Sequence, residues 1–117
     1  MNIEEIREYC LSKKAVNEST PFDDVTLVFK VAGKIFALLP LDEIELSINL
    51  KCDPEKAISL REEYPAVKPG WHMSKKHWNT IKVGELNNPS LLYEWIDDSY
   101  KCVVGGLSGK IRKEYGL

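Results

Sequence analysis

The spacing of apolar residues changes at position 26, and this change constrains the fold more than any other feature of the chain. From there to residue 51, apolar side chains recur at every second position, as in a β-strand with one face in a core. Turn-forming residues divide the stretch into strands at residues 26–31, 35–39 and 44–51. The first two strands, joined at Gly33-Lys34, form a hairpin. The third alternates most regularly, and its predicted inward side chains are Ile44, Leu46, Ile48 and Leu50.

Three other segments have the patterns of helices. The first begins at Asn2, which forms a capping-box sequence with Glu5, and we expect it to end near Lys13 or Lys14. An Asp-Pro and an Asn-Pro pair open the other two, at residues 53–64 and 88–105. The polar residues 15–25 predict a loop, and residues 107–117 predict a tail.

Residues 66–84 predict a second hairpin, with arms at residues 67–73 and 77–83 and the tip at Ser74-Lys75-Lys76. Alternation along the arms places Trp71 inward and Trp78 outward or at an edge. The predicted order is therefore α-β-β-β-α-β-β-α. Hairpins imply antiparallel pairing, so we expect a two-layer α+β sandwich in which helices pack on one face of a five-stranded antiparallel sheet. The 117 residues suit a single domain.

The composition excludes several classes of protein. No apolar run approaches the ~20 residues of a membrane span, and the first ten residues carry acids where a signal peptide needs a basic and then an apolar segment. Cys10, Cys52 and Cys102 are widely spaced and odd in number, which predicts reduced thiols rather than a disulfide framework. We expect a cytoplasmic, monomeric protein without membrane association.

Positive charge is concentrated in residues 66–84. This segment holds four lysines, both histidines and two of the three tryptophans but no acid, while the rest of the chain has 12 cations against 18 acids. Cations interleaved with aromatic side chains can face phosphates and stack on bases. With a net charge of −2, any nucleic-acid contact must come from a local patch and be salt-sensitive. The competing interpretation is a solvated hairpin whose tryptophans pack against helices.

Patterns for catalysis or metal binding are weak. His72 and His77 flank a turn, but no Cys, Asp or Glu lies near them in sequence to complete a metal site. The glycine-rich residues 103–110 lack the spacing and the Ser/Thr of a phosphate-binding loop. No cysteine and histidine have a spacing that favours a nucleophile–base pair. We therefore expect no enzymatic activity, no cofactor and no metal site.

Four stretches, in order along the chain, resemble the MmcQ/YjbR family of small bacterial proteins. They are Pro21-Phe22, residues 30–37 (KVAGKIFA), residues 64–80 (from YPAV to WHMSKKHWNT) and residues 92–100. The family is described as predicted DNA-binding proteins with a CyaY-like fold. The resemblance spans most of residues 1–117, and the fold it implies, helices on a five-stranded antiparallel sheet, agrees with the predicted order.

The resemblance implies weak binding of duplex DNA through a double wing, that is, two hairpins that both contact the duplex. The first wing would hold Lys30 and Lys34. In the second wing, with Lys68 behind its tip, the resemblance implies contacts from Trp71, His72, Lys75, Lys76, His77 and Trp78.

Two alternatives stay open. A protein-interaction or chaperone-like module would use the sheet face, or an exposed Trp78, as an apolar anchor. A frataxin-like cation binder would use the acidic face of the first helix, formed by Glu4, Glu5 and Glu8.

Overall fold

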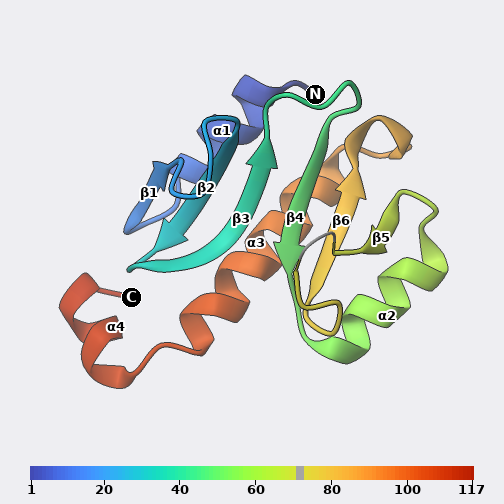
Figure 1. Ribbon diagram of the computed structural model, residues 1–117. Helices are drawn as coiled ribbons and strands as arrows, with labels where there is room; N and C mark the ends of the chain where they lie inside the picture. Colours follow the sequence, from blue (N-terminus) through green and yellow to red (C-terminus); the bar gives the residue numbers. More distant parts are fainter. Residues whose placement is uncertain (71–72) are drawn as a thin grey trace.

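The structure is a computed structural model that describes residues 1–70 and 73–117 (Figure 1). In these ranges the chain forms six strands, four α-helices and one 3-10 helix. Their order is α1 (Ile3–Leu11), β1 (Val16–Ser19), β2 (Thr26–Val31), β3 (Lys34–Pro40), β4 (Ser47–Lys51), α2 (Pro54–Glu63), β5 (Val67–Pro69), β6 (Trp78–Lys82), η1 (Val83–Glu85), α3 (Ser90–Gly105) and α4 (Gly109–Tyr115).

All six strands form one antiparallel sheet in the order β1-β2-β3-β4-β6-β5. The α+β class is confirmed, but the prediction of five strands is wrong. The additional strand is β1, which lies in the predicted loop of residues 15–25 and pairs Val16 with Val31. Because β1 is short, lies at the sheet edge and has one apolar residue, its sequence carries almost no period-two signal.

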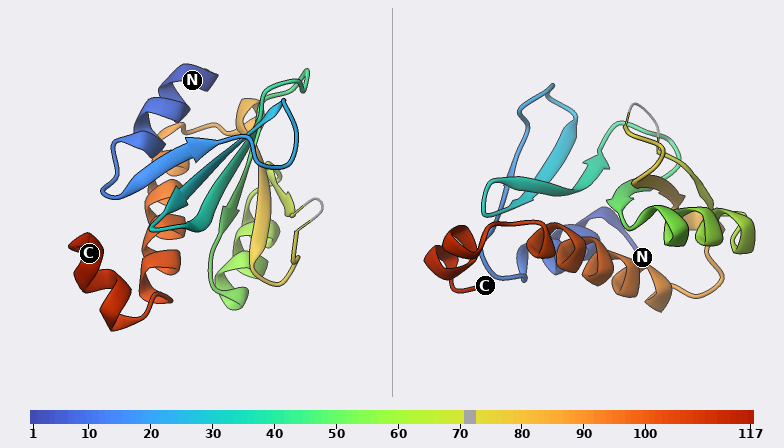
Figure 2. Two further views of the ribbon diagram at one scale, coloured as in Figure 1. Left: turned by 60° about the vertical axis from the view of Figure 1, so that its left-hand side comes forward. Right: turned by 90° about the horizontal axis from the view of Figure 1, so that it is seen from below.

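The helices cover one face of the sheet, and the core lies between the two layers (Figure 2). Helix α3 crosses behind β3 and β4, and α2 lies beside β5 and β6. The opposite side of the sheet, which we call the open face, carries no helix formed by the described residues. The fully buried core side chains include Ile6, Phe29, Phe36, Leu39, Ile48, Leu92 and Ile96.

Local capping signals fix where the helices begin. The backbone N–H of Glu5 donates to Asn2 Oδ1 at 2.9 Å, and Glu5 accepts in return, so the capping box is confirmed. Asp53 likewise accepts from Lys56 N at 3.0 Å and opens α2. The end of α1 comes earlier than predicted, at Leu11.

Residues 109–115 form helix α4, so the prediction of a tail is wrong there. Ser108 caps the helix by accepting from Ile111 N at 3.2 Å, and Gly116 ends it with a left-handed φ of 70°. No residue of α4 is buried. Its apolar residues, Ile111 and Tyr115, are too few to form the longer periodic pattern from which the sequence predicts a helix.

A β-bulge in β3 changes which side chains face the core. The register shifts between Phe29 and Lys30, so that Phe36 and Ala37 both lie opposite Phe29. The extra residue moves Ile35 to the open face, where the simple alternation had predicted it inward. Ser99 of α3 supports the bulge by donating its hydroxyl to the Phe36 carbonyl at 2.6 Å.

Strand β4 begins at Ser47, three residues later than predicted. Ile48 and Leu50 are buried in the core as expected, and Leu46 packs against it. Ile44, however, is fully exposed, so its predicted inward orientation is wrong. It lies in the loop between β3 and β4, outside the paired part of the strand.

Candidate nucleic-acid interface

The two predicted wings turn at the same end of the sheet. Strands β2, β4 and β5 run in one direction, and β3 and β6 run in the other. The β2–β3 turn and the β5–β6 turn therefore lie at one end, with the last residue of β4 between them (Figure 1). This arrangement is the one that a double wing requires.

The first turn is short and well defined. Ala32 and Gly33 have φ values of 48° and 84°, as in the type I′ turns that join two strands through two residues. Lys30 and Lys34 flank it; Lys34 is exposed, and Lys30 is half-buried on the open face.

The second turn is held by main-chain hydrogen bonds. The Ser74 carbonyl accepts from the Trp78 N–H at 2.9 Å, and the His77 carbonyl accepts from Cys52 N at 2.9 Å. Arg61 of α2 donates to the Lys75 carbonyl at 2.7 Å. These contacts fix the backbone of the tip against α2 and leave the side chains of Lys75 and Lys76 exposed.

Trp78 does not reach solvent as expected. Alternation places it on the open face correctly, but its side chain is only 8% exposed and packs against Val28 and Leu38. Met73 and Ile35 pack against the same cluster. Met73 therefore covers part of the tryptophan, and the buried Trp78 supports the hairpin from within this cluster.

The other predicted site residues lie in different places. Trp71 and His72 fall outside the described residues. His77 is half-buried in the turn, and Lys68 is exposed on β5, opposite Thr80 and away from the tip.

Lys51, at the end of β4, joins the lysines of the two turns, although the sequence interpretation did not assign it to the site. It pairs with Trp78 across β4 and β6, so alternation directs its side chain to the open face. We call the five lysines at this end of the sheet the basic end: Lys30, Lys34, Lys51, Lys75 and Lys76. None of them forms an ion pair with a described residue.

The opposite end of the sheet is acidic. The β1–β2 loop and the β3–β4 loop both lie there, because each connects strands at the end away from the basic end. Their carboxylates are Asp23, Asp24, Asp42, Glu43 and Glu45. The loops at this end of the sheet therefore carry carboxylates, whereas the hairpin turns at the other end carry lysines.

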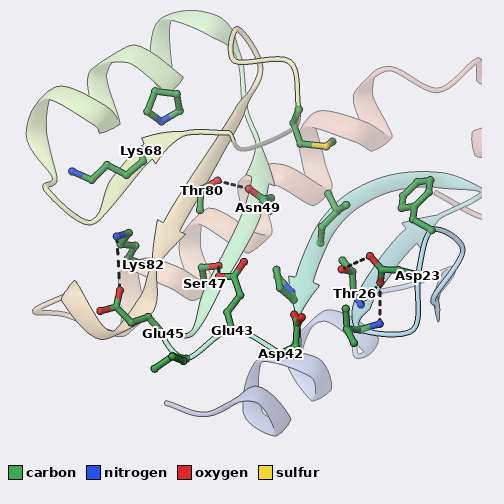
Figure 3. Close-up of a pocket in the computed structure, with 17 residues that line it drawn as sticks. Asp23, Thr26, Asp42, Glu43, Glu45, Ser47, Asn49, Lys68, Thr80 and Lys82 are labelled. Carbon is green, nitrogen blue, oxygen red and sulfur yellow. Dashed lines mark hydrogen bonds and ion pairs between the residues drawn. The ribbon is translucent and has the colours of Figure 1, made fainter.

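A groove of about 1060 Å³ lies on the open face (Figure 3). Leu38, Pro40 and Met73 give it apolar surface. Thr80 donates a hydrogen bond to Asn49 Oδ1, and the Ser47 hydroxyl donates to Glu43 at 3.0 Å.

Both signs of charge line the groove. Asp23 accepts from the backbone N–H groups of Val25 and Thr26, and these hydrogen bonds lower the pKa of its carboxyl. Lys82 lies 3.8 Å from a carboxylate oxygen of Glu45.

Sequence comparison identifies the family. A family model described as YjbR matches residues 11–102. The chain belongs to the YjbR family. It is 32% identical to the protein YjbR of Escherichia coli K12 over 113 residues, which cover 97% of this chain and 96% of that one. It is also 43% identical to the protein YbdF of Escherichia coli O157:H7 over 93 residues, 80% of this chain and 76% of YbdF.

Solved structures share the fold. The crystal structure of the Deinococcus radiodurans protein DR2400 is 36% identical, with a TM-score of 0.93 over 99% of this chain and 88% of that one. A protein from Pseudomonas syringae is 26% identical, with a TM-score of 0.74 over 86% of this chain and 97% of its own. Both E. coli relatives are described as uncharacterized, so they bring no activity to this YjbR-family chain.

The thiols of this YjbR-family chain are poor nucleophiles where they are buried. Burial raises the pKa of Cys10 to about 12 and that of Cys52 to about 11, so neither forms appreciable thiolate near neutral pH. Among the described residues, no three His, Cys, Asp or Glu side chains cluster closely enough to hold a metal ion. In the same part of the chain, no helix has the length and apolar character needed to cross a membrane.

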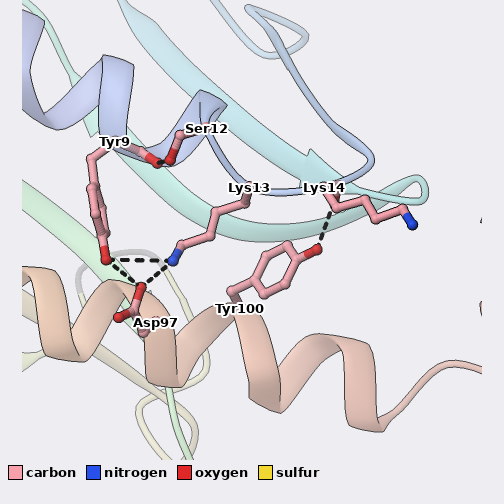
Figure 4. A network of polar contacts seen from close by, with 6 residues as sticks. All are labelled: Tyr9, Ser12, Lys13, Lys14, Asp97 and Tyr100. Atoms are coloured by element: carbon pink, nitrogen blue, oxygen red, sulfur yellow. Dashed lines mark hydrogen bonds and ion pairs between the residues drawn. The ribbon is translucent and has the colours of Figure 1, made fainter. Parts of the chain in front are cut away.

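A second polar cluster joins α1 to α3 (Figure 4). The Tyr9 hydroxyl donates to Asp97 Oδ1 at 2.7 Å, and Lys13 forms an ion pair with the same carboxylate. Beside it, the Tyr100 hydroxyl donates to the Lys14 carbonyl at 2.6 Å. Burial opposes ionisation of Asp97, but the hydrogen bonds from Lys13 and Tyr9 outweigh it and lower the pKa of this carboxyl. The cluster therefore has a structural role, because it holds the end of α1 against α3.

The substitution Asp97→Asn should lower the free energy of unfolding by up to about 1 kcal/mol near neutral pH, the value of a partly exposed ion pair. Because the folded-state pKa lies below the ordinary 3.8, Asp97 contributes stability above that pH and loses it as the pH falls through the folded-state value. The difference between the variant and the native protein should therefore shrink in acid. Urea unfolding at several pH values measures it, with Glu94→Gln on the exposed side of α3 as control. A difference independent of pH would contradict this assignment.

Proposed function

We propose that this protein is a non-enzymatic, cytoplasmic protein that binds duplex DNA weakly through the two hairpin turns of the basic end. The main observation in favour of this proposal is that five lysines lie at one end of the sheet without ion-pair partners among the described residues. Lysines are point charges suited to phosphate oxygens, and phosphate contacts position a protein on DNA without reading sequence.

The hydrogen bonds and turn geometry that hold the two hairpin turns in place favour the same proposal. A type I′ turn and a turn bonded to α2 hold the lysines on rigid backbone, so little order must be created on binding. The acidic end faces away from a duplex placed across the two turns. The two-layer arrangement also supports the CyaY-like plan that the family resemblance implies, and the free cysteines suit a reducing cytoplasm.

Phosphate binding by about four lysines predicts a particular salt dependence. The slope of log affinity against log salt should be about −3.6, so raising salt from about 50 to 200 mM should weaken binding about 150-fold. Fluorescence anisotropy with a labelled duplex measures this slope. Two duplexes of unrelated sequence should give similar affinities, since no base-reading group is required. Absence of binding at low salt, or a slope near zero, would overturn the proposal.

The alternative function, cation binding by Glu4, Glu5 and Glu8, has less structural support than DNA binding. These side chains are exposed on α1, and Glu5 already accepts the Asn2 backbone N–H at 3.2 Å in the capping box. Surface carboxylates in this arrangement are ordinarily solvated. We therefore place DNA binding ahead of it.

A further inference from the structure

Exposed apolar side chains gather on the two loops beside the groove. Among the large hydrophobic residues that the structure describes, Phe22 is 66% exposed and Ile44 is fully exposed. Val25 and Leu41, on the same two loops, are also exposed. Exposed apolar side chains gathered around a hollow are typical of an interaction site.

The carboxylates of these loops make the surface around the groove negatively charged. Asp23, Asp42, Glu43 and Glu45 line the groove, against Lys68 and Lys82. Asp42 forms no ion pair with a described residue, and Glu45 meets Lys82 only at 3.8 Å. Such a surface repels phosphate and suits a segment that carries both apolar and basic side chains.

Helix α4 is a segment of that chemistry. It carries Lys110, Arg112 and Lys113 with a single acid, Glu114. Ile111 and Tyr115, four residues apart, lie on one side of the helix, and Tyr115 is 46% exposed. Since no residue of α4 is buried, the rest of the described chain does not fully cover the apolar side of this helix.

We propose that α4 of one copy docks in the groove of a second copy. Within one molecule α4 lies in the helical layer, whereas the loops of the groove project from the other side of the sheet (Figure 2). The contact therefore joins separate copies, with Ile111 and Tyr115 against the apolar groove and the basic side chains against Asp42 and Glu43. An interface of one short helix is small, so association is weak and reversible.

Sedimentation velocity from micromolar to millimolar protein tests this proposal. The native protein should associate as its concentration rises. Lys110→Glu with Lys113→Glu should weaken association about tenfold or more, because like charges then face each other. Asp42→Lys with Glu43→Lys should do the same. All four positions are exposed, so folding should be retained, and circular dichroism confirms it.

Combining the two pairs of substitutions restores opposite charges and should recover much of the lost association. Lys75→Glu with Lys76→Glu is the control. It changes the net charge by the same amount as Lys110→Glu with Lys113→Glu, but at the basic end, and should leave association unchanged. This control also separates the inference from the DNA proposal, which depends on those two lysines. A native protein that stays monomeric throughout, or a combined variant that does not recover, would overturn the inference.

Discussion

Replacement of Trp78 by alanine is expected to lower the free energy of unfolding by about 3 kcal/mol, the lower end of the range for a buried aromatic residue. The indole is 8% exposed and fills the small apolar cluster of the open face, where it contacts Val28 and Leu38. Removing it leaves a cavity and exposes these two side chains. Urea unfolding followed by circular dichroism measures the loss.

The same substitution should also weaken DNA binding although it changes no charge. Met73 packs against the cluster that the indole completes, and Gly70 N donates to the Trp78 carbonyl at 2.9 Å. Loss of the side chain frees the segment that presents Lys75 and Lys76. Trp78→Phe retains an aromatic ring and should keep most of both properties. A loss below about 1 kcal/mol for alanine would mean that the indole is not a packed side chain.

Gly70 explains why the hairpin approaches the tryptophan so closely. A Cβ atom at this position would lie 2.8 Å from Trp78 Cβ and 2.9 Å from its carbonyl oxygen. Neither a side chain nor the main chain there can move away without breaking β6. The absence of a side chain at residue 70 is therefore a requirement of the fold, and the sequence alone showed only a glycine in a hairpin arm.

Local signals in the sequence predicted the elements that have strong local causes. Asn2 and Asp53 form their capping bonds with residues three positions away, so both helix starts could be read directly. The first hairpin was also predicted, but its turn was placed one residue late, at Gly33-Lys34, whereas Ala32 and Gly33 have the positive φ angles of the turn. Family membership was predicted as well, from residues distributed along most of the chain.

Features that depend on distant partners were missed. The bulge at Phe36 is stabilised by Ser99, 63 residues away, and it alone reverses the direction of Ile35. Strand β1 exists because β2 offers it an edge, and its own sequence is mostly polar. Trp78 is buried because Val28, Leu38 and Met73 pack against it, which period-two arithmetic cannot describe.

The charge separation also required the topology. The sequence showed a basic segment at residues 66–84, but it did not show that Lys30, Lys34 and Lys51 lie at the same end. The strand directions bring them together and send the acidic loops to the other end. The candidate site was therefore only partly predictable, because its charges come from three separate parts of the chain.

Reversal of charge at the second turn, Lys75→Glu with Lys76→Glu, is expected to remove most of the affinity for duplex DNA. Each lost phosphate contact reduces the steepness of the salt dependence by about one unit, so the slope should fall from about −3.6 to about −2. The new carboxylates also repel phosphate, so affinity at about 50 mM salt should fall about 100-fold. Fluorescence anisotropy in dilute protein measures both quantities.

The matched control is Lys110→Glu with Lys113→Glu, which makes the same change in net charge on α4. If DNA binds through Lys75 and Lys76, this control should reduce affinity less than the variant at the second turn, because Lys110 and Lys113 lie on α4, outside both hairpin turns. Equal losses would show that bulk charge governs binding and would contradict a site at the hairpins. Since Lys75 and Lys76 are exposed and unpaired with described residues, neither substitution should alter the free energy of unfolding by more than about 0.5 kcal/mol, so a loss of affinity reports on the contact with DNA.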